Sequence, residues 1–161
     1  MPLKQDSKLG RAVISMAASP RFLNIAPKFV PKVDRFLNKV TGGRVLMSAG
    51  MVPSLVLTAT GARSGRSYDT PLATVPDGDA FYIVGSNYGQ EKHPAWTANL
   101  RANPEATVTF KGRRIPVRAR MLDAEEKQEV WPKLTSVWPN YDAYVVKSGG
   151  RDLRVFRLEP R

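Results

Sequence analysis

The chain has 161 residues, of which 42% are hydrophobic and 24% charged, a composition typical of one folded domain rather than of a disordered chain. It contains 25 Lys and Arg against 14 Asp and Glu, a formal charge of +11, so an anionic partner is expected. It has no cysteine and a single histidine, His93, which excludes disulfides, thiolate metal sites, cysteine nucleophiles and multi-histidine metal sites. Chemistry, if the chain performs any, is therefore expected to come from a bound cofactor.

The first quarter of the chain, residues 1–44, is strongly basic and is predicted to form a helical arm. It holds nine Lys and Arg against two Asp, and helices are expected over residues 4–18 and 28–40. In the second helix Phe29, Val33 and further apolar residues share one face. Two interpretations stay open: packing on the domain with a solvated basic face, or reversible binding to an anionic membrane surface. The apolar runs are far shorter than the ~20 residues that span a bilayer, so we expect a cytoplasmic protein, located at the inner face of the cell membrane if the arm binds lipid.

Residues 45–161 are predicted to form one mainly β domain with a few helices. Period-two alternation and turn residues predict six antiparallel strands, at residues 55–60, 68–75, 80–85, 107–110, 115–122 and 153–158. The Asp77-Gly78 and Lys111-Gly112 pairs are typical of hairpin turns. Because helices do not alternate with the strands, a doubly wound parallel sheet is disfavoured. The expected fold class is α+β, with an antiparallel sheet closed into a barrel.

Two helices are predicted between the later strands. The first spans residues 94–103, since proline suits its first turn and an Asn-Pro pair ends it. The second begins at Asp123, because Asp123 and Glu126 have the spacing of a capping box. Pro132 is expected to end or kink this helix.

The first candidate site is the connection at residues 61–66. Its two glycines allow backbone N–H groups to turn inward, and Arg63 and Arg66 can clamp phosphate oxygens. It is not a Walker A loop, because the Lys-Ser/Thr ending is absent and a strand rather than a helix follows it. An anion-binding loop and an ordinary basic hairpin turn both fit this pattern.

Two further candidates follow along the chain. After the third strand, His93 could act as a general base or as a structural cap, and Trp96 taken alone would be assigned to the core. Trp138, Tyr141 and Tyr144 cluster before the last strand, where a tyrosine hydroxyl could donate a hydrogen bond or a proton to a reducible oxygen, or the rings could simply pack. No carboxylate pair and no stacking platform of aromatic and basic residues stands out, so neither an acid–base dyad nor nucleic-acid binding is predicted.

Six segments occur in a characteristic order along the chain. They are Leu-Thr-Ala-Thr-Gly at 57–61 with Arg-Ser-Gly at 63–65, Val-Gly-Ser-Asn at 84–87, Lys-His-Pro-Ala-Trp at 92–96, Asn-Leu-Arg-Ala-Asn-Pro at 99–104, Trp-Pro at 131–132, and Pro139 with Tyr141. Together they resemble the deazaflavin-dependent nitroreductase and quinone reductase family, whose members are small split β-barrels related to flavin-binding oxidoreductases. The resemblance covers residues 51–160 and implies an antiparallel split β-barrel here.

The resemblance also implies an activity and a cofactor. The cofactor is coenzyme F-420, an 8-hydroxy-5-deazaflavin with a phosphate and an oligoglutamate tail, which donates a hydride. The implied reaction is hydride transfer from reduced F-420 to a quinone, a nitroaromatic or an activated enone. A non-catalytic carrier of a deazaflavin or a lipid, built on the same barrel, is the alternative. No metal is implied.

Site residues follow from the resemblance as well. The implied cofactor-binding residues are Arg63, Ser64, Gly65 and Arg66 at the phosphate, Lys92 near the tail, and Pro71, Leu72, Ser86, Asn87 and Trp96 around the deazaflavin. The implied substrate-binding residues are Trp138, Tyr141 and Tyr144. Tyr141 and Ser86 are the catalytic candidates, with Tyr141 as the group that hydrogen-bonds the acceptor. The family often has two basic residues after the first glycine of the loop; Ala62 takes the first of these positions, which weakens the expected clamp unless Arg66 compensates.

Overall fold

The computed structural model describes residues 52–161 together with Lys28 and Lys32. Both lysines are helical and exposed. The rest of the predicted arm and residues 45–51 lie outside the described residues, so the arm and its boundary at residue 44 stay predictions. Within the described part of the chain, no helix has the length and apolar character needed to cross a membrane.

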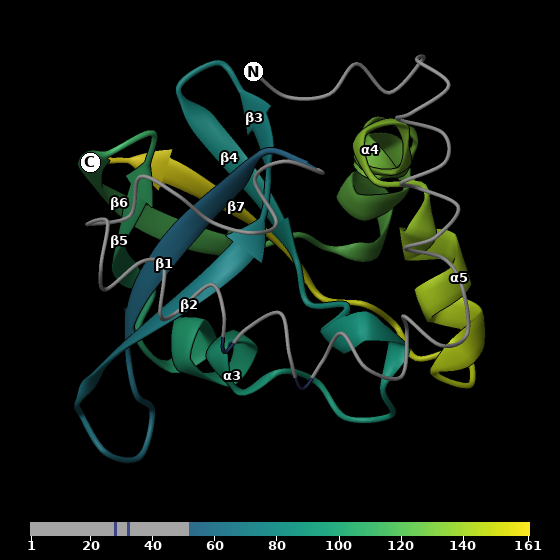
Figure 1. The fold of residues 1–161 in the computed structure, drawn as a ribbon, viewed down its shortest axis with the longest axis horizontal. Helices are drawn as coiled ribbons and strands as arrows, with labels where there is room; N and C mark the ends of the chain where they lie inside the picture. The colour runs from purple at the N-terminus through teal and green to yellow at the C-terminus, as the bar shows by residue number, and fades with distance from the viewer. Residues whose placement is uncertain (1–27, 29–31, 33–51) are drawn as a thin grey trace.

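Seven antiparallel strands form one curled sheet in the order β2-β1-β5-β6-β7-β4-β3 (Figure 1). Their bounds are β1 Ser54–Thr60, β2 Ser67–Ala73, β3 Val75–Asp77, β4 Ala80–Val84, β5 Glu105–Phe110, β6 Arg113–Met121 and β7 Val155–Pro160. The helices are η2 Asn87–Gly89, a 3-10 helix, and the α-helices α3 Ala95–Ala102, α4 Ala124–Val137 and α5 Asn140–Lys147. The predicted antiparallel barrel with helices is confirmed.

The two edges of the sheet meet at Thr74. β2 and β3 are the outermost strands of the sheet, yet only Thr74 separates them along the chain. The sheet must therefore curl until its edges touch, and the Thr74 hydroxyl secures this corner by donating to the Tyr82 carbonyl at 2.9 Å. Away from the corner, β2 leads back to residues 61–66, whereas β4 continues into residues 85–93. The two segments thus run apart from the corner, and we call the region between β2 and the end of β4 the split.

Every residue of β4 is buried, because this strand has a core on each face. Phe81 and Ile83 point into the barrel interior, where they join Trp96 on α3 in one apolar cluster. Tyr82 and Val84 alternate with them and pack in a second cluster beneath α4 and α5. The strand at the rim of the split is thus held rigidly on both sides.

The helices take up distinct positions around the barrel. α3 covers one end of it, and α4 and α5 lie together on the side beyond β3 and β4 (Figure 1). The predicted capping box of α4 is confirmed: the Glu126 N–H donates to the Asp123 carboxylate at 2.9 Å, and the Asp123 N–H donates to the Glu126 carboxylate at 3.1 Å. The Trp131 indole on α4 donates to the Asp142 carboxylate on α5 at 2.8 Å, which ties the two helices together.

Two expectations about elements are corrected. Of the two alternatives at Pro132, an end of the helix is wrong, because α4 continues to Val137, and a kink stays a prediction. Proline in a helix interior costs about 3 kcal/mol, and the fully buried Leu134 in the turn after it supplies apolar packing that offsets this cost. The strand predicted at residues 68–75 is divided at Thr74 into β2 and β3, which gives seven strands among the described residues rather than six, because the chain crosses there from one sheet edge to the other.

Candidate functional site

The loop at residues 61–66 is closed by its own backbone and fastened to α3. The Gly61 N–H donates to the Arg66 carbonyl at 2.8 Å, and the Gly65 N–H donates to the Gly61 carbonyl at 3.0 Å. The Ala62 N–H donates to the Asn99 side-chain oxygen on α3 at 3.0 Å. Gly65 has φ +67°, a left-handed conformation that favours glycine. The loop therefore has a defined shape although it projects from the barrel.

The positive charge of this loop is not neutralised. Arg63 and Arg66 are exposed, and among the described residues neither forms an ion pair with a carboxylate. Ser64 hydrogen-bonds the Tyr68 hydroxyl at 3.0 Å, and the Arg66 guanidinium donates to the same oxygen at 3.4 Å. These two hydrogen bonds lower the pKa of Tyr68, and the one with Ser64 has the larger effect. Two guanidinium groups without a carboxylate partner among the described residues, beside a hydroxyl, are suited to binding a phosphate.

Pro71 and Leu72 lie on β2, the edge strand that borders the split. Both are half-buried, and Leu72 packs against the cluster that fills the barrel. In the register of the sheet, Pro71 pairs with Val56 and Leu72 with Leu55 of β1, so the other edge of β2 faces the split. Leu72 is six positions after Arg66, which corresponds to about 20 Å along an extended strand. The arginine loop and the residues beside the corner thus stand at opposite ends of β2.

Ser86 and Asn87 lie on the other side of the split, in the segment at residues 85–93 that follows β4. Both are half-buried, and the Asn87 side-chain amide donates to the Lys92 carbonyl at 2.9 Å. Lys92 itself is exposed. Asn87 and Tyr88 have φ +46° and +52°, values uncommon for residues with side chains. Strain of this kind persists only where surrounding contacts enforce it.

Arg151, which the sequence analysis did not identify, holds the backbone on both sides of these two residues. Its Nη1 donates to the Gly85 carbonyl at 3.0 Å, its Nη2 to the Ser86 carbonyl at 2.7 Å and its Nε to the Gln90 carbonyl at 3.1 Å. It lies more than 60 residues from these partners, in an ordinary-looking Gly-Gly-Arg sequence. No local pattern could have revealed it.

His93 completes this arrangement. Its Nδ1 lies 2.8 Å from Arg151 Nη1. Because a guanidinium only donates, Nδ1 is the acceptor and the proton of the neutral ring is on Nε2. Burial, followed by the charges of Arg154 and Arg151, holds the pKa of His93 below its usual value. His93 thus has a structural contact with Arg151 but does not cap α3, whose N-terminus has no side-chain cap hydrogen bond. Its role as a general base stays a hypothesis.

Trp96 lies in the core of the barrel. It is 6% exposed, and its ring centroid is 5.7 Å from that of Phe156. Trp96 and Leu100 both pack into the barrel interior from α3, as their spacing of four residues predicts. A direct role for Trp96 beside the cofactor stays a prediction.

Trp138, Tyr141 and Tyr144 come together at the start of α5, as expected, and all three are buried. The Trp138 indole donates to the Tyr144 hydroxyl at 3.3 Å, and the Tyr141 and Tyr144 ring centroids are 6.3 Å apart. Burial raises the pKa of Tyr141 well above its usual value, so its hydroxyl is protonated at neutral pH. Tyr88, at the rim of the split, contacts Tyr144 with ring centroids 6.2 Å apart. The cluster therefore lies directly behind η2, at the opposite end of the split from the arginine loop.

Known proteins are similar to this chain in both sequence and fold. A family model described as F420H(2)-dependent quinone reductase matches residues 32–160. A relative of that name from Mycobacterium tuberculosis strain H37Rv is 39% identical over 77 residues, which is 48% of this chain and 52% of the relative. A second relative from the same strain is 30% identical over 92 residues, 57% of this chain and 77% of its own length. The match to the first of these thus spans about half of its length.

Solved structures agree with these sequence relatives. The structure of an F420-H2 dependent reductase, FDR-A, is 34% identical and aligns with a TM-score of 0.61 over 66% of this chain and 94% of its own. A structure described as a domain-swapped dimer is 30% identical, with a TM-score of 0.62 over 78% of this chain and 94% of its own.

Proposed function

Because the chain belongs to the F420H(2)-dependent quinone reductase family, we propose that it is an oxidoreductase that uses coenzyme F-420 to reduce a quinone. The quinone receives a hydride and a proton and becomes a hydroquinone, and the cofactor is left oxidised, so electrons and hydrogens balance. The observation in the structure that supports this most directly is the split, with an unneutralised arginine loop at one end and a protonated tyrosine cluster at the other. No feature of the described residues favours the carrier alternative.

The residues that border the split fit a polyanionic deazaflavin. Among the described residues, Arg63 and Arg66 have no carboxylate partner, so they can hold a phosphate in a bidentate manner. The tight turn at Gly61 brings Ser64 beside them. A Cβ on Gly61 would lie 2.5 Å from the Ser64 hydroxyl, so the loop needs glycine there. Lys92 adds a further exposed positive charge beside the split.

The ring subsite is proposed to lie between Pro71 and Leu72 on one rim and Ser86 and Asn87 on the other. The bound cofactor supplies the hydride, and the protein positions it. Arg151 fixes the Ser86 rim through its carbonyl contacts, and β4 is buried on both faces, so this wall is pre-organised. A rigid wall would hold the reacting faces of the cofactor ring and the quinone against each other and exclude water from them.

Tyr141 is the proposed hydrogen-bond donor to the quinone oxygen. Its raised pKa keeps the proton on the hydroxyl, so at neutral pH it can donate but not act as a base. It is only 3% exposed, and its neighbour Tyr144 contacts the half-buried Tyr88. A quinone therefore reaches Tyr141 only when neighbouring side chains move aside.

Binding of F-420 tests the arginine loop. We expect the fluorescence of oxidised F-420 to change on titration with the protein, and Arg63→Ala or Arg66→Ala to weaken binding by about tenfold at low salt. The loss should shrink as salt is added, because salt screens exposed charges. Arg113→Ala is the matched control: Arg113 is an exposed arginine on the β5–β6 hairpin, and its loss should leave the affinity unchanged. Equal effects of all three substitutions, or no fluorescence change with the unaltered protein, would overturn the assignment.

Two finer points of the function belong to the same proposal. Nitroaromatics and activated enones are alternative acceptors for the same hydride, and a panel of acceptors ranks them against quinones. The basic arm at residues 1–44 is proposed to bind an anionic membrane, where lipid-soluble quinones are found. Liposomes rich in anionic lipid should retain the whole chain and release a chain that starts near residue 43; equal retention of both would contradict this role of the arm.

A further inference from the structure

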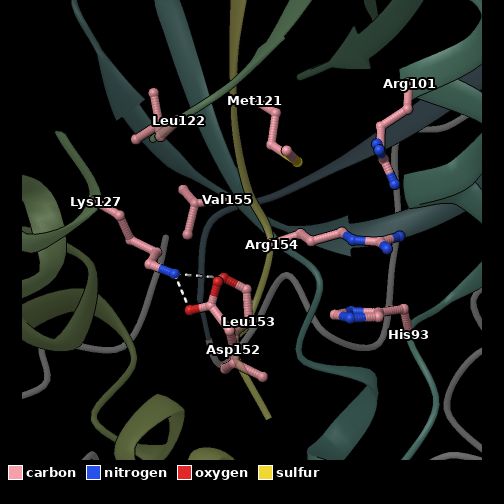
Figure 2. Close-up of a pocket in the computed structure, with 9 residues that line it drawn as sticks. All are labelled: His93, Arg101, Met121, Leu122, Lys127, Asp152, Leu153, Arg154 and Val155. Atoms are coloured by element: carbon pink, nitrogen blue, oxygen red, sulfur yellow. Dashed lines mark hydrogen bonds and ion pairs between the residues drawn. The ribbon is translucent and has the colours of Figure 1, made fainter. Parts of the chain in front are cut away.

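A pocket of about 260 Å³ opens on the β7 side of the segment at residues 85–93. Four nitrogen-bearing side chains line it: His93 from that segment, Arg101 from α3, Arg154 from just before β7, and Lys127 from α4 (Figure 2). Figure 2 shows the Arg154 guanidinium between Arg101 and His93. The pocket is thus a meeting point of positive charge that the proposed reaction does not use.

The carboxylates near the pocket do not neutralise this charge. Asp152 is the one acidic residue among those that line it, and Asp152 already pairs with Lys127. Arg154 donates to the neutral Thr97 hydroxyl at 2.9 Å. Among the described residues, neither Arg101 nor Arg154 forms an ion pair. Two guanidinium groups therefore face the pocket without a counter-ion.

The adjacent cavity differs from the pocket in this respect. That cavity shares Arg101 with the pocket and is also lined by Arg118 and Arg120. Arg120 pairs with Glu126 at 2.7 Å, and Arg118 lies 3.9 Å from the Glu105 carboxylate. The arginines that line only the adjacent cavity each have a carboxylate, whereas Arg154 in the pocket has none among the described residues.

The pocket is separate from the split. The Gly85 N–H donates to the Arg154 carbonyl at 2.7 Å, so residues 85–93 run directly between the two. In the sheet order β7 and β3 lie on opposite sides of β4, and the split lies on the β3 side. On α3, Arg101 is about 200° around the helix from Asn99, which holds the arginine loop.

We propose that this pocket binds an oxyanion, a phosphate or a carboxylate group, through the guanidinium groups of Arg101 and Arg154 beside His93. Guanidinium groups bind both kinds of oxyanion in a bidentate manner. The volume is below the roughly 300 Å³ at which pockets for larger ligands begin, and it suits a small anionic group. Burial, followed by the charges of Arg154 and Arg151, lowers the pKa of His93, so an anion that offsets those charges should raise it.

His93 provides a direct probe because it is the single histidine of the sequence. Its ring resonance, followed by NMR as the pH is varied, should titrate below the usual midpoint in a phosphate-free buffer. Inorganic phosphate should move the midpoint upward by about half a pH unit, because an anion offsets the repulsion from the arginines. An unchanged midpoint at tens of millimolar phosphate and with triglutamate would overturn the proposal.

Variants show whether the shift comes from this pocket. Arg101→Gln should weaken the phosphate effect at least fivefold, and since Arg101 is exposed this variant is expected to fold. Arg113→Gln removes the same charge at the other end of β6, about 27 Å along the strand from the pocket. This variant should behave as the unaltered protein. Equal phosphate effects in both variants would contradict the assignment.

The source of the oxyanion is distinguished by adding F-420. A phosphate shift that persists when the protein is saturated with F-420 indicates an independent anion. If F-420 alone produces the shift and phosphate then adds nothing, the pocket holds an anionic group of the cofactor. Both results require the oxyanion site. Neither measurement depends on hydride transfer, so failure of the site and failure of the proposed function can be distinguished.

Discussion

Arg151 organises one rim of the split with a single side chain. It donates to three backbone carbonyls of residues 85–90 and to His93. Backbone carbonyls accept from guanidinium groups in charge-assisted hydrogen bonds, which are stronger than neutral ones. The uncommon backbone angles of Asn87 and Tyr88 are maintained within this framework. Ser86 therefore depends for its position on a residue far away in the sequence.

Protonation of His93 should weaken this framework. The pKa of His93 is lowered in the folded state by burial and by Arg154, Arg151 and Arg101, with Asp152 opposing them. Unfolded His93 binds a proton near pH 6.5, so the unfolded chain takes up more protons and stability falls as the pH drops below about 6.5. We expect the melting temperature to fall between about pH 7.5 and 5.5, and His93→Asn, whose amide oxygen can still accept from Arg151, to reduce that fall. The same decrease in both proteins would contradict this.

Tyr141 is the residue whose proposed role is chemical as well as structural. Tyr141→Phe should lower the turnover of a soluble naphthoquinone by at least about tenfold, the lower range for loss of a proton donor, with F-420 affinity unchanged. Tyr82→Phe is the control, because the Tyr82 hydroxyl accepts from Arg157 at 2.6 Å in a separate network. It should affect stability only. If Tyr141→Phe also affected only stability, Tyr141 would be a packing residue.

At the scale of elements, η2 and α5 approach each other closely at Gly89. A Cβ there would lie 3.0 Å from Lys147 Cβ and 3.1 Å from Tyr144 Cα, and Gly89 has φ +74°. Any side chain would push η2 away from the aromatic cluster. This contact therefore joins the rim of the split to the helix that carries Tyr141.

A pair of glycine substitutions measures this contact. Gly89→Ala and Gly78→Ala both place a Cβ at positive φ, but Gly78 has open space around it. The backbone cost of about 1 kcal/mol is common to both, and Gly89→Ala should lose at least about 1 kcal/mol more because of overpacking. Urea unfolding gives the two free energies. Equal losses would show that η2 and α5 are not tightly coupled.

The sequence predicts local features of these elements better than their tertiary consequences. The capping box of α4 and the basic loop were visible because each signal lies within a few neighbouring residues. Pro132 does not end α4, since packing of the buried Leu134 offsets the local cost of proline in a helix. The crossing at Thr74 and the clamp of Arg151 could not be predicted, because each depends on contacts between distant segments.

At the scale of the whole molecule, the charge of +11 is unevenly neutralised. Acidic residues such as Asp77 and Glu126 are engaged in ion pairs on the barrel and on α4. Among the described residues, the guanidinium groups of Arg63, Arg66 and Arg101 form no ion pair, and neither does that of the exposed Arg113. The unpaired charge thus includes the proposed ligand contacts but is not confined to them, and most of the excess charge lies in residues 1–44.

The curled sheet brings the parts of the proposed site together in one small domain. Its edges meet at Thr74 and diverge from there, so the region between β2 and the end of β4 follows from the topology. Helices α4 and α5 contribute buried aromatic residues beyond β4. In the proposed site, the barrel would supply the wall, the loop the charge and the helices the protonated hydroxyl.

The most direct test mixes the protein with reduced F-420 and a soluble quinone under anaerobic conditions. The return of oxidised F-420 is followed by its fluorescence, and hydroquinone is measured at the end. We predict oxidation of F-420 that depends on the protein, with one hydroquinone formed for each cofactor oxidised. Reduced F-420 that binds the protein but is never oxidised by any quinone would contradict the proposed function.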